Sequence, residues 1–277
     1  MEGAQGNMVE PVFVEGSAGR LFAVYHPPAI ETADTRDVIY VPPFAEEMNR
    51  SRRMATLQAK SLAAIGIGVL IIDLFGTGDS AGDFRDAQWR IWLGDILSAA
   101  DWLERRSHRR LALWGLRLGA LLATAVASRE CGRFMHLVLW QPVTDGHVML
   151  TQFLRVRVAA SMTEGRGQET TDGLRAELAA GRPVEIAGYE LSPELAKGIE
   201  AARMDGCALP PGVRVDWLEV GSAAGDTISP AGRRVVETWR ASGIEVSAVT
   251  VPGQQFWTLQ ETTLAPDLLA ATRRIFE

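Results

Sequence analysis

Residues 111–120 hold the feature that most limits how this chain can fold. Four apolar residues lead into Gly115-Leu-Arg117-Leu-Gly119, and small and apolar residues follow over 120–128. The first run predicts a buried strand and the second a buried helix. Glycines on both sides of the turn predict a sharp bend, where strand and helix approach too closely for side chains. The chain therefore has a strand–turn–helix unit with an arginine at its tip.

Strand and helix patterns alternate along most of the 277 residues, which predicts a mainly parallel sheet with helices on both faces. An antiparallel hairpin, residues 9–14 and 20–25, is expected to open the chain. The further expected strands are 37–41, 69–74, 111–114, 137–140, 213–220 and 245–251. The expected helices of this core are 51–65, 87–106, 120–128, 230–242 and 263–276.

The alternation fails between residues 145 and 204. Helices are expected near 148–162 and 172–180, and a third begins where Ser192 precedes Pro193, because serine caps helices and proline suits the first turn. We interpret residues 145–204 as a cap inserted over the strand ends. The core of the fold then comprises residues 1–144 and 205–277.

Composition excludes several classes of protein. The net charge of −6, without a long basic run, argues against nucleic-acid binding. The first residues lack the basic start and apolar stretch of a signal peptide, and no apolar run is long enough to span a membrane, so a cytoplasmic location is expected. Cys131 and Cys207 form no disulfide framework or zinc motif and are expected as free thiols. We expect no metal and no cofactor.

Three local motifs, in this order, resemble the α/β-hydrolase superfamily over nearly the whole chain. They are the Asp73-Leu-Phe-Gly-Thr-Gly-Asp-Ser80 turn, the Gly115–Gly119 turn, and Pro252-Gly253 after the last strand. The resemblance implies an α/β-hydrolase fold with a cap. In that fold the strand–turn–helix unit is the nucleophile elbow, whose motif is Gly-x-Ser-x-Gly.

A narrower resemblance rests on three stretches. Val41-Pro-Pro-Phe-Ala-Glu-Glu-Met-Asn-Arg-Ser-Arg52, the turn Trp-Gly-Leu-Arg-Leu-Gly-Ala and the tail Pro-Gly-Gln-Gln-Phe-Trp are similar to the type 2 hydrolase-like proteins of exosortase A systems. That family is bacterial and is associated with exopolysaccharide production and protein sorting. The resemblance implies this context, with a protein partner from such a system, rather than a particular reaction.

The catalytic triad that the fold implies is degenerate here. Arg117 occupies the nucleophile position, and arginine stays protonated and cannot attack a carbonyl. Gln255 occupies the position of the general-base histidine and cannot accept and return a proton near neutral pH. Asp226 suits the position of the acid, although an acidic residue at a strand end also caps helices. One of three triad members remains.

The geometry of an oxyanion hole is expected to survive without the nucleophile. The backbone N–H of Leu118 lies at a helix N-terminus, which favours anions. The loop after residues 37–41 is expected to supply a second N–H from Phe44 or Ala45. A ligand pocket is therefore expected around a set of seven residues: Arg117, Leu118, Phe44, Ala45, Glu46, Gln255 and Trp257.

An arginine at this turn is costly unless it is paired, because the helix dipole disfavours a cation there. Glu46 or Glu47 is the nearest expected partner, followed by Asp226 or Asp145. Three interpretations of Arg117 remain open. Arg117 either forms an internal bridge that fills a dead pocket, or binds a carboxylate or phosphate of a ligand. A third role, as an electrophile in an unconventional reaction, also remains.

No other residue set restores the triad. Ser80 is expected to serve its own turn, and Ser51 to cap a helix. Ser222 has no histidine nearby in sequence, and the pair Asp145 and His147 is expected to be solvated. The segment 49–53 is expected to be a solvated helix start, although its arginines could contact an anionic ligand.

Two functional hypotheses follow. The first is a noncatalytic or atypical α/β-hydrolase-fold protein that binds an anionic or acyl-bearing small molecule, or a partner protein, through Arg117. The alternative is a genuine hydrolase (esterase- or thioesterase-like) or acyltransferase that uses a nonstandard nucleophile or an activated water. The state of the pocket distinguishes both hypotheses from a purely structural role of Arg117. A collapsed cavity favours a structural bridge, and an open cavity favours a ligand.

Overall fold

The computed structural model describes residues 9–31, 35–164, 169–221 and 227–277. The central sheet has the strand order β1-β2-β4-β3-β5-β6-β9-β10. Strands β1 and β2 pair antiparallel, as do β2 and β4, and the remaining neighbours in this order are parallel. The strands are β1 (Glu10–Glu15), β2 (Arg20–His26), β3 (Arg36–Val41), β4 (Ile67–Ile72), β5 (Arg110–Leu116), β6 (Phe134–Trp140), β9 (Arg214–Gly221) and β10 (Glu245–Pro252).

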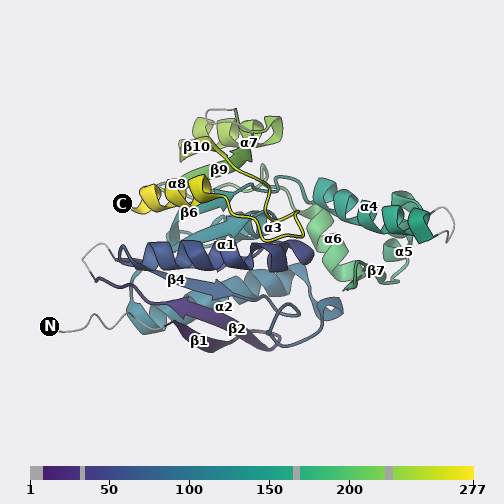
Figure 1. Ribbon diagram of the computed structural model, residues 1–277, viewed down its shortest axis with the longest axis horizontal. Helices are drawn as coiled ribbons and strands as arrows, with labels where there is room; N and C mark the ends of the chain where they lie inside the picture. Colours follow the sequence, from purple (N-terminus) through teal and green to yellow (C-terminus); the bar gives the residue numbers. More distant parts are fainter. Residues whose placement is uncertain (1–8, 32–34, 165–168, 222–226) are drawn as a thin grey trace.

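Helices cover both faces of the sheet, as its buried strands require (Figure 1). One face packs against α1 (Glu46–Ala63) and α8 (Pro266–Phe276), which lie side by side. The other packs against α2 (Trp89–Ser107), α3 (Leu118–Ala127) and α7 (Pro230–Ala241). This is the predicted architecture, a mostly parallel sheet between helical layers.

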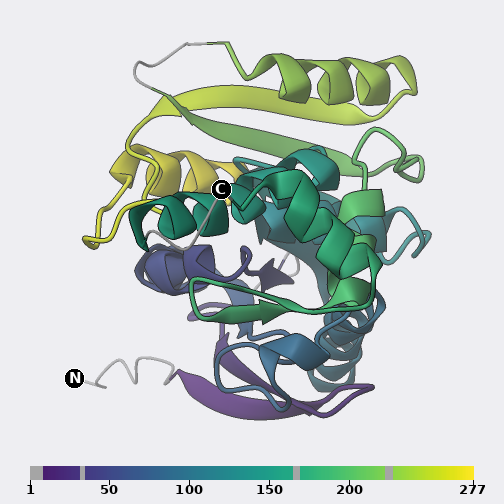
Figure 2. The same ribbon diagram turned by 90° about the vertical axis from the view of Figure 1, so that its right-hand side faces the viewer.

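The elements between β6 and β9 lie beyond the strand ends and are seen face-on in Figure 2. They include α4 (Gly146–Glu164), α5 (Thr171–Ala179) and α6 (Pro193–Ala201), and Ser192 caps α6 as expected. Between α5 and α6 lies a hairpin of β7 (Val184–Ile186) and β8 (Tyr189–Leu191), which the sequence analysis did not predict. The hairpin packs against a short 3₁₀ helix, η1 (Phe84–Asp86), of the core.

The largest boundary error concerns the start of helix α1. Helix α1 begins at Glu46, not at Ser51, so segment 49–53 is helical and Ser51 is a buried residue within it. The helix follows Ala45, which has φ 50° and ψ −126° and makes no side-chain cap. Because no capping side chain marks this start, the prediction placed the start of the helix at the next serine.

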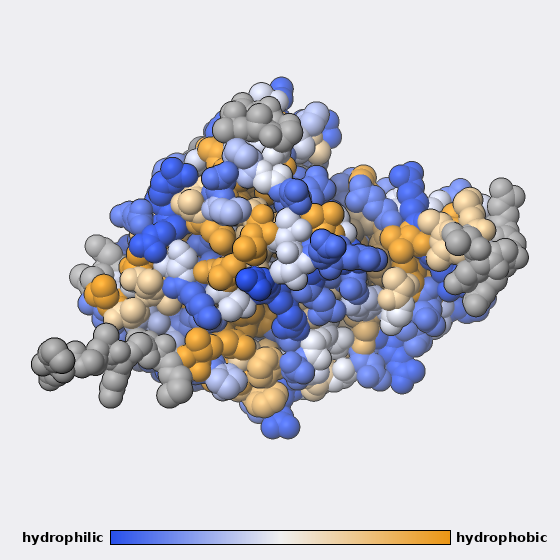
Figure 3. Space-filling model, in the orientation of Figure 1, coloured by the Kyte–Doolittle hydropathy of each residue, from blue (hydrophilic) through white to orange (hydrophobic). Residues whose placement is uncertain are grey.

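The surface shown in Figure 3 is largely hydrophilic and is interrupted by apolar patches. Among the described residues, no helix combines the length and apolarity that crossing a membrane requires.

Candidate functional site

The turn after β5 keeps the geometry of the predicted elbow. Arg117 joins β5 to α3 with φ 56° and ψ −118°, a conformation that non-glycine residues rarely adopt. A Cβ atom at Gly115 would lie 2.5 Å from backbone atoms of Ala120, and one at Gly119 would clash with the carbonyl oxygen of Val41. The predicted reason for both glycines, close approach of backbone to backbone, is therefore confirmed.

Hydrogen bonds hold the strained residue in place. The N–H of Arg117 donates to the carbonyl oxygen of Trp140 at 3.0 Å. Its carbonyl oxygen accepts from the N–H groups of Ala120 (3.1 Å) and Val143 (3.2 Å). Strain of this kind persists only where the surroundings impose it, and it is concentrated at functional sites. The turn thus presents its side chain in one fixed direction.

The side chain of Arg117 is anchored at one end. Its Nε donates to Oε1 of Glu47 at 3.2 Å, and its Cζ lies 5.8 Å from the centre of the Trp257 ring. The side chain is 18% exposed. Neither terminal guanidinium nitrogen has a hydrogen-bond partner among the residues that the structure describes. One edge of the guanidinium is fixed by the protein, and its other donors remain for a ligand.

Of the four carboxylates that the sequence analysis considered as partners of Arg117, Glu47 is the one that pairs with it. Glu46 instead accepts from the Tyr189 hydroxyl at 3.2 Å and lies 3.9 Å from Arg50. Asp145 pairs with Arg203 at 3.3 Å. Asp226 lies outside the described residues.

The Glu47 side chain is mostly buried, with 19% exposed, and its carboxylate is only half satisfied. Its Oε1 accepts the bond from Arg117, but its buried Oε2 has no partner within the described part of the chain. Burial raises the pKa of this carboxyl, and the nearby Arg117 only partly offsets the effect. A buried carboxylate with an unused oxygen and a raised pKa, set in a cavity, is typical of functional sites.

Arg117 and Glu47 line a cavity of about 260 Å³ that is open rather than collapsed. Its base is formed by the start of α1 and the loop before it, and its wall by one face of α4. A residue of the hairpin turn, Ala187, and the loop after β10 complete it. The lining residues are Phe44, Ala45, Glu46, Glu47, Arg50, Arg117, Met149, Gln152, Phe153, Val156, Ala187, Trp257 and Thr258.

Two of the residues expected around this pocket do not line it. Gln255 is exposed and its backbone oxygen accepts from the N–H of Thr258, so the turn places Gln255 outside and Trp257 inside. Leu118 is fully buried and borders a separate void of about 10 Å³ together with Phe44 and Ala45. The N–H groups of Leu118 and Ala45 have no acceptor among the described residues. A void of this size holds one water molecule.

Of the other nucleophile and base candidates, Ser80 and His147 have structural partners, whereas the buried hydroxyl of Ser51 has none among the described residues. The Ser80 hydroxyl donates to the Asp73 carbonyl at 2.6 Å and accepts from the N–H of Phe22, so it serves its turn as expected. His147 is exposed and hydrogen-bonds Glu200 at 2.9 Å rather than Asp145. Ser222 lies outside the described residues.

Sequence analysis missed the wall that α4 contributes. Met149, Phe153 and Val156 recur at intervals of four and three, which places them on one helix face. That spacing was a usable signal, but a helix face that lines a cavity has the same pattern as one that packs in a core. Arg50 was considered only as one of the arginines of segment 49–53; it lines the cavity and donates to the carbonyl oxygen of Thr258 at 2.8 Å.

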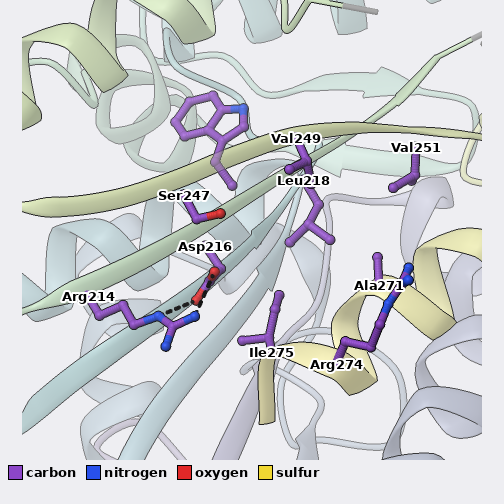
Figure 4. A pocket seen from close by; sticks show the side chains of 10 residues that line it. Arg214, Asp216, Leu218, Ser247, Val249, Val251, Ala271, Arg274 and Ile275 are labelled. Carbon is purple, nitrogen blue, oxygen red and sulfur yellow. Dashed lines mark hydrogen bonds and ion pairs between the residues drawn. The ribbon is translucent and has the colours of Figure 1, made fainter. Parts of the chain in front are cut away.

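A different cavity, of about 340 Å³, lies between β10 and α8 (Figure 4). Asp216, the one carboxylate among its described lining residues, is fully engaged: it accepts from Arg214 at 3.0 Å and pairs with His136 at 2.7 Å. Burial disfavours its charged form, but the bonds from His136 and Arg214 prevail and lower the pKa of this carboxyl. This site holds no reactive group comparable with Glu47. Within the described residues, no cluster of three or more His, Cys, Asp or Glu side chains could hold a metal ion.

Comparison with known proteins adds a family and a fold. A family model described as serine aminopeptidase, S33, matches residues 37–203. No curated protein matches the chain significantly in sequence. Similar solved structures include Est1E from Butyrivibrio proteoclasticus with ferulic acid bound, at a TM-score of 0.68 and 15% identity over 96% of each chain.

Two further structures agree with this result. The α/β hydrolase GrgF from Penicillium sp. sh18 gives a TM-score of 0.65 at 17% identity over 97% of each chain. A putative hydrolase from Agrobacterium vitis S4 gives 0.64 at 19% identity, over 98% of this chain and 99% of that one. At such identities, the likeness concerns the fold alone.

Proposed function

The chain belongs to the serine aminopeptidase S33 family and has the α/β-hydrolase fold, and from that premise we propose that it binds an acyl-bearing or aromatic carboxylate in the Arg117 cavity. Binding, not Ser-His-Asp catalysis, is the proposed role of the site. An arginine cannot act as a nucleophile, and the glutamine at the expected base position is exposed outside the cavity.

The observation that carries the proposal is the half-used guanidinium. Glu47 holds Nε of Arg117, while the cavity stays open and the two terminal nitrogens lack partners in the described part of the structure. Two parallel N–H donors fit the two oxygens of a carboxylate. A bidentate structural bridge would use both oxygens of Glu47, whereas Oε2 is unused among the described residues.

The remaining lining supports an apolar body on the ligand. Phe44, Phe153 and Trp257 surround the cavity with aromatic rings, and Phe44 and Phe153 lie in edge contact at 4.9 Å between centroids. A cavity of about 260 Å³ suits a small ligand, near the lower end for drug-sized molecules. An aromatic acid such as ferulic acid, which the Est1E structure holds, combines both features and is the probe of choice.

Calorimetric titration with ferulate tests the proposal. Wild-type protein is expected to bind, and Arg117→Met to bind at least about tenfold more weakly. Arg117→Lys keeps the charge but loses the paired donors, so it should recover binding only in part. Arg182→Met, which removes an exposed arginine of the cap, is the matched control and should change nothing. Equal binding by wild type and Arg117→Met would refute the proposal.

A second candidate function rests on Glu47. Its raised pKa and unused oxygen suit a general base that activates water, with Arg117 polarising a carbonyl. Membership of a hydrolase family is consistent with this hydrolase or acyltransferase alternative.

Short p-nitrophenyl esters and a fluorophosphonate probe decide between the two candidates. The binding proposal predicts no turnover above background and no labelling. Turnover that Glu47→Gln abolishes would favour the alternative, and a labelled serine would reveal an unrecognised nucleophile.

The finer biological context also remains a proposal. The three stretches similar to type 2 hydrolase-like proteins of exosortase A systems support a role in exopolysaccharide production or protein sorting, with a partner protein from such a system. Deleting the gene in its host and measuring secreted polysaccharide tests this. An unchanged yield and unchanged sorting would contradict it.

A further inference from the structure

A second cavity, of about 370 Å³, lies between α1 and the strands β2, β3 and β4. In Figure 1 this region is the part of the sheet below α1, toward β1. Helix α1 separates it from the Arg117 cavity: Glu46, Glu47 and Arg50 line the latter, whereas Arg52 and Lys60 line the former. Its volume falls in the range of small-molecule sites, about 300 to 1,000 Å³.

Two deeply buried polar side chains line this second cavity without partners. His26 and Tyr40 are each 3% exposed. Nε2 of His26 and the hydroxyl of Tyr40 are buried, and neither makes a hydrogen bond within the described residues. Buried polar atoms nearly always have a partner, so an unsatisfied pair beside one cavity indicates a missing group. That group must accept or donate a hydrogen bond to each.

The charged groups at this cavity favour an anion. Arg52 is neutralised by Asp73, which it contacts at 3.0 Å. Lys60, in the last turn of α1, has no ion pair in the part of the chain that the structure describes. Burial, followed by the charge of Lys60, lowers the pKa of His26, so this imidazole is neutral at physiological pH. Among the described lining residues, the one uncompensated charge is therefore the Lys60 ammonium.

We infer that this second cavity is a binding site for a short-chain organic carboxylate. The carboxylate would pair with Lys60 and accept the Tyr40 hydroxyl proton, and His26 would complete its hydrogen bonds. Val24 and Ile71, with other apolar lining residues, would contact the hydrocarbon chain. The site is independent of the proposed function, because it shares no lining residue with the Arg117 cavity.

The four histidines of the chain make the inference directly testable by NMR. Imidazole ring signals of the wild-type protein are recorded during titration with hexanoate, and in parallel with hexanamide, which has the same chain without the charge. Single histidine variants assign the signals. If His26→Gln does not fold, the variants of the other three histidines identify the His26 signal by elimination.

Hexanoate is expected to shift the His26 signal saturably, and hexanamide to bind at least about tenfold more weakly. Lys60→Gln, which changes a residue exposed to solvent, should weaken hexanoate binding by a similar factor. Arg117→Met should leave this shift unchanged, which separates the second cavity from the first. No saturable shift of His26, or a shift that Lys60→Gln does not weaken, would overturn the inference.

Discussion

Two buried carboxylates, each beside an arginine, behave in opposite ways in this molecule. Asp216, at the cavity of Figure 4, uses both oxygens: Arg214 contacts both and His136 contacts one. Glu47, at the Arg117 cavity, receives one bond and leaves one oxygen buried without a partner among the described residues. The pKa of Asp216 is lowered and that of Glu47 is raised.

The difference shows that the presence of an arginine does not by itself define the role of a buried pair. A carboxylate whose hydrogen bonds are complete stabilises the fold in its charged form. A carboxylate whose hydrogen bonds are incomplete, beside an open cavity, is available to interact with a ligand. The following predictions test this distinction through the free energy of unfolding, measured with urea, in order of decreasing effect.

Arg117→Met should destabilise the protein by about 3 kcal/mol at neutral pH, because it leaves the Glu47 charge buried and unpaired. Loss of the arginine raises the Glu47 pKa further. The loss of unfolding free energy should therefore be larger at about pH 8 than at about pH 5, where Glu47 takes up a proton. In a Glu47→Gln background, the same substitution should cost much less. An equal cost in both backgrounds would show that the pair does not carry the effect.

Asp216→Asn should cost about 2 kcal/mol at neutral pH, because it removes a charge that His136 and Arg214 stabilise. The folded-state pKa of Asp216 is lowered, so its contribution is present above the unfolded-state pKa. It is lost as the pH falls through the folded-state value. The cost should thus shrink in acid, as that of Arg117→Met does, but at lower pH, because the pKa of Asp216 is lowered and that of Glu47 is raised. A cost that grows in acid would contradict the comparison.

Asp95→Asn extends the comparison to a carboxylate with no cation. Asp95 is fully buried, accepts one bond from the N–H of Phe75, and has a pKa raised by burial to about 7. The unfolded chain ionises first as the pH rises, so the cost of this residue to stability grows between about pH 4 and pH 7 and is complete above that range. Asp95→Asn should stabilise the protein by about 1 to 2 kcal/mol at about pH 8 and make little difference at about pH 4. Destabilisation at the higher pH would contradict the stated cause.

Glu47→Gln should have the smallest effect, a gain of about 0.5 kcal/mol at neutral pH. Its amide keeps an acceptor for Arg117 and removes a charge that burial disfavours. The gain should increase as the pH rises from about 5 to about 8. A loss comparable with that of Asp216→Asn would mean that Glu47 is a structural carboxylate like Asp216.

The sequence predicted the parts of the fold that local chemistry determines. The spacing of Gly115 and Gly119 around Arg117 predicted the turn, because only glycine allows backbone atoms to approach so closely there. The β7–β8 hairpin was missed because three-residue strands carry too little periodicity. Its turn residues, Ala187 and Gly188, both have positive φ, which is typical of a tight hairpin turn.

The candidate site was predicted less completely, because it depends on long-range packing. The sequence left four carboxylates as possible partners of Arg117, and the position of α1 in the fold is what brings Glu47 into contact with it. It placed Gln255 in the pocket with Trp257, but the turn after β10 separates the two. The apolar face of α4 became part of the site only through the position of the cap.

The most direct test of the account compares ferulate with methyl ferulate on the wild-type protein. The two ligands share the same aromatic body, and the ester replaces the carboxylate that Arg117 is proposed to recognise by an uncharged methyl ester, which would also report hydrolysis. The account predicts that ferulate binds at least about tenfold more tightly than the ester. It also predicts that Arg117→Met abolishes this preference and that no ferulate is released from the ester above background. Equal binding of acid and ester, or turnover of the ester, would contradict it.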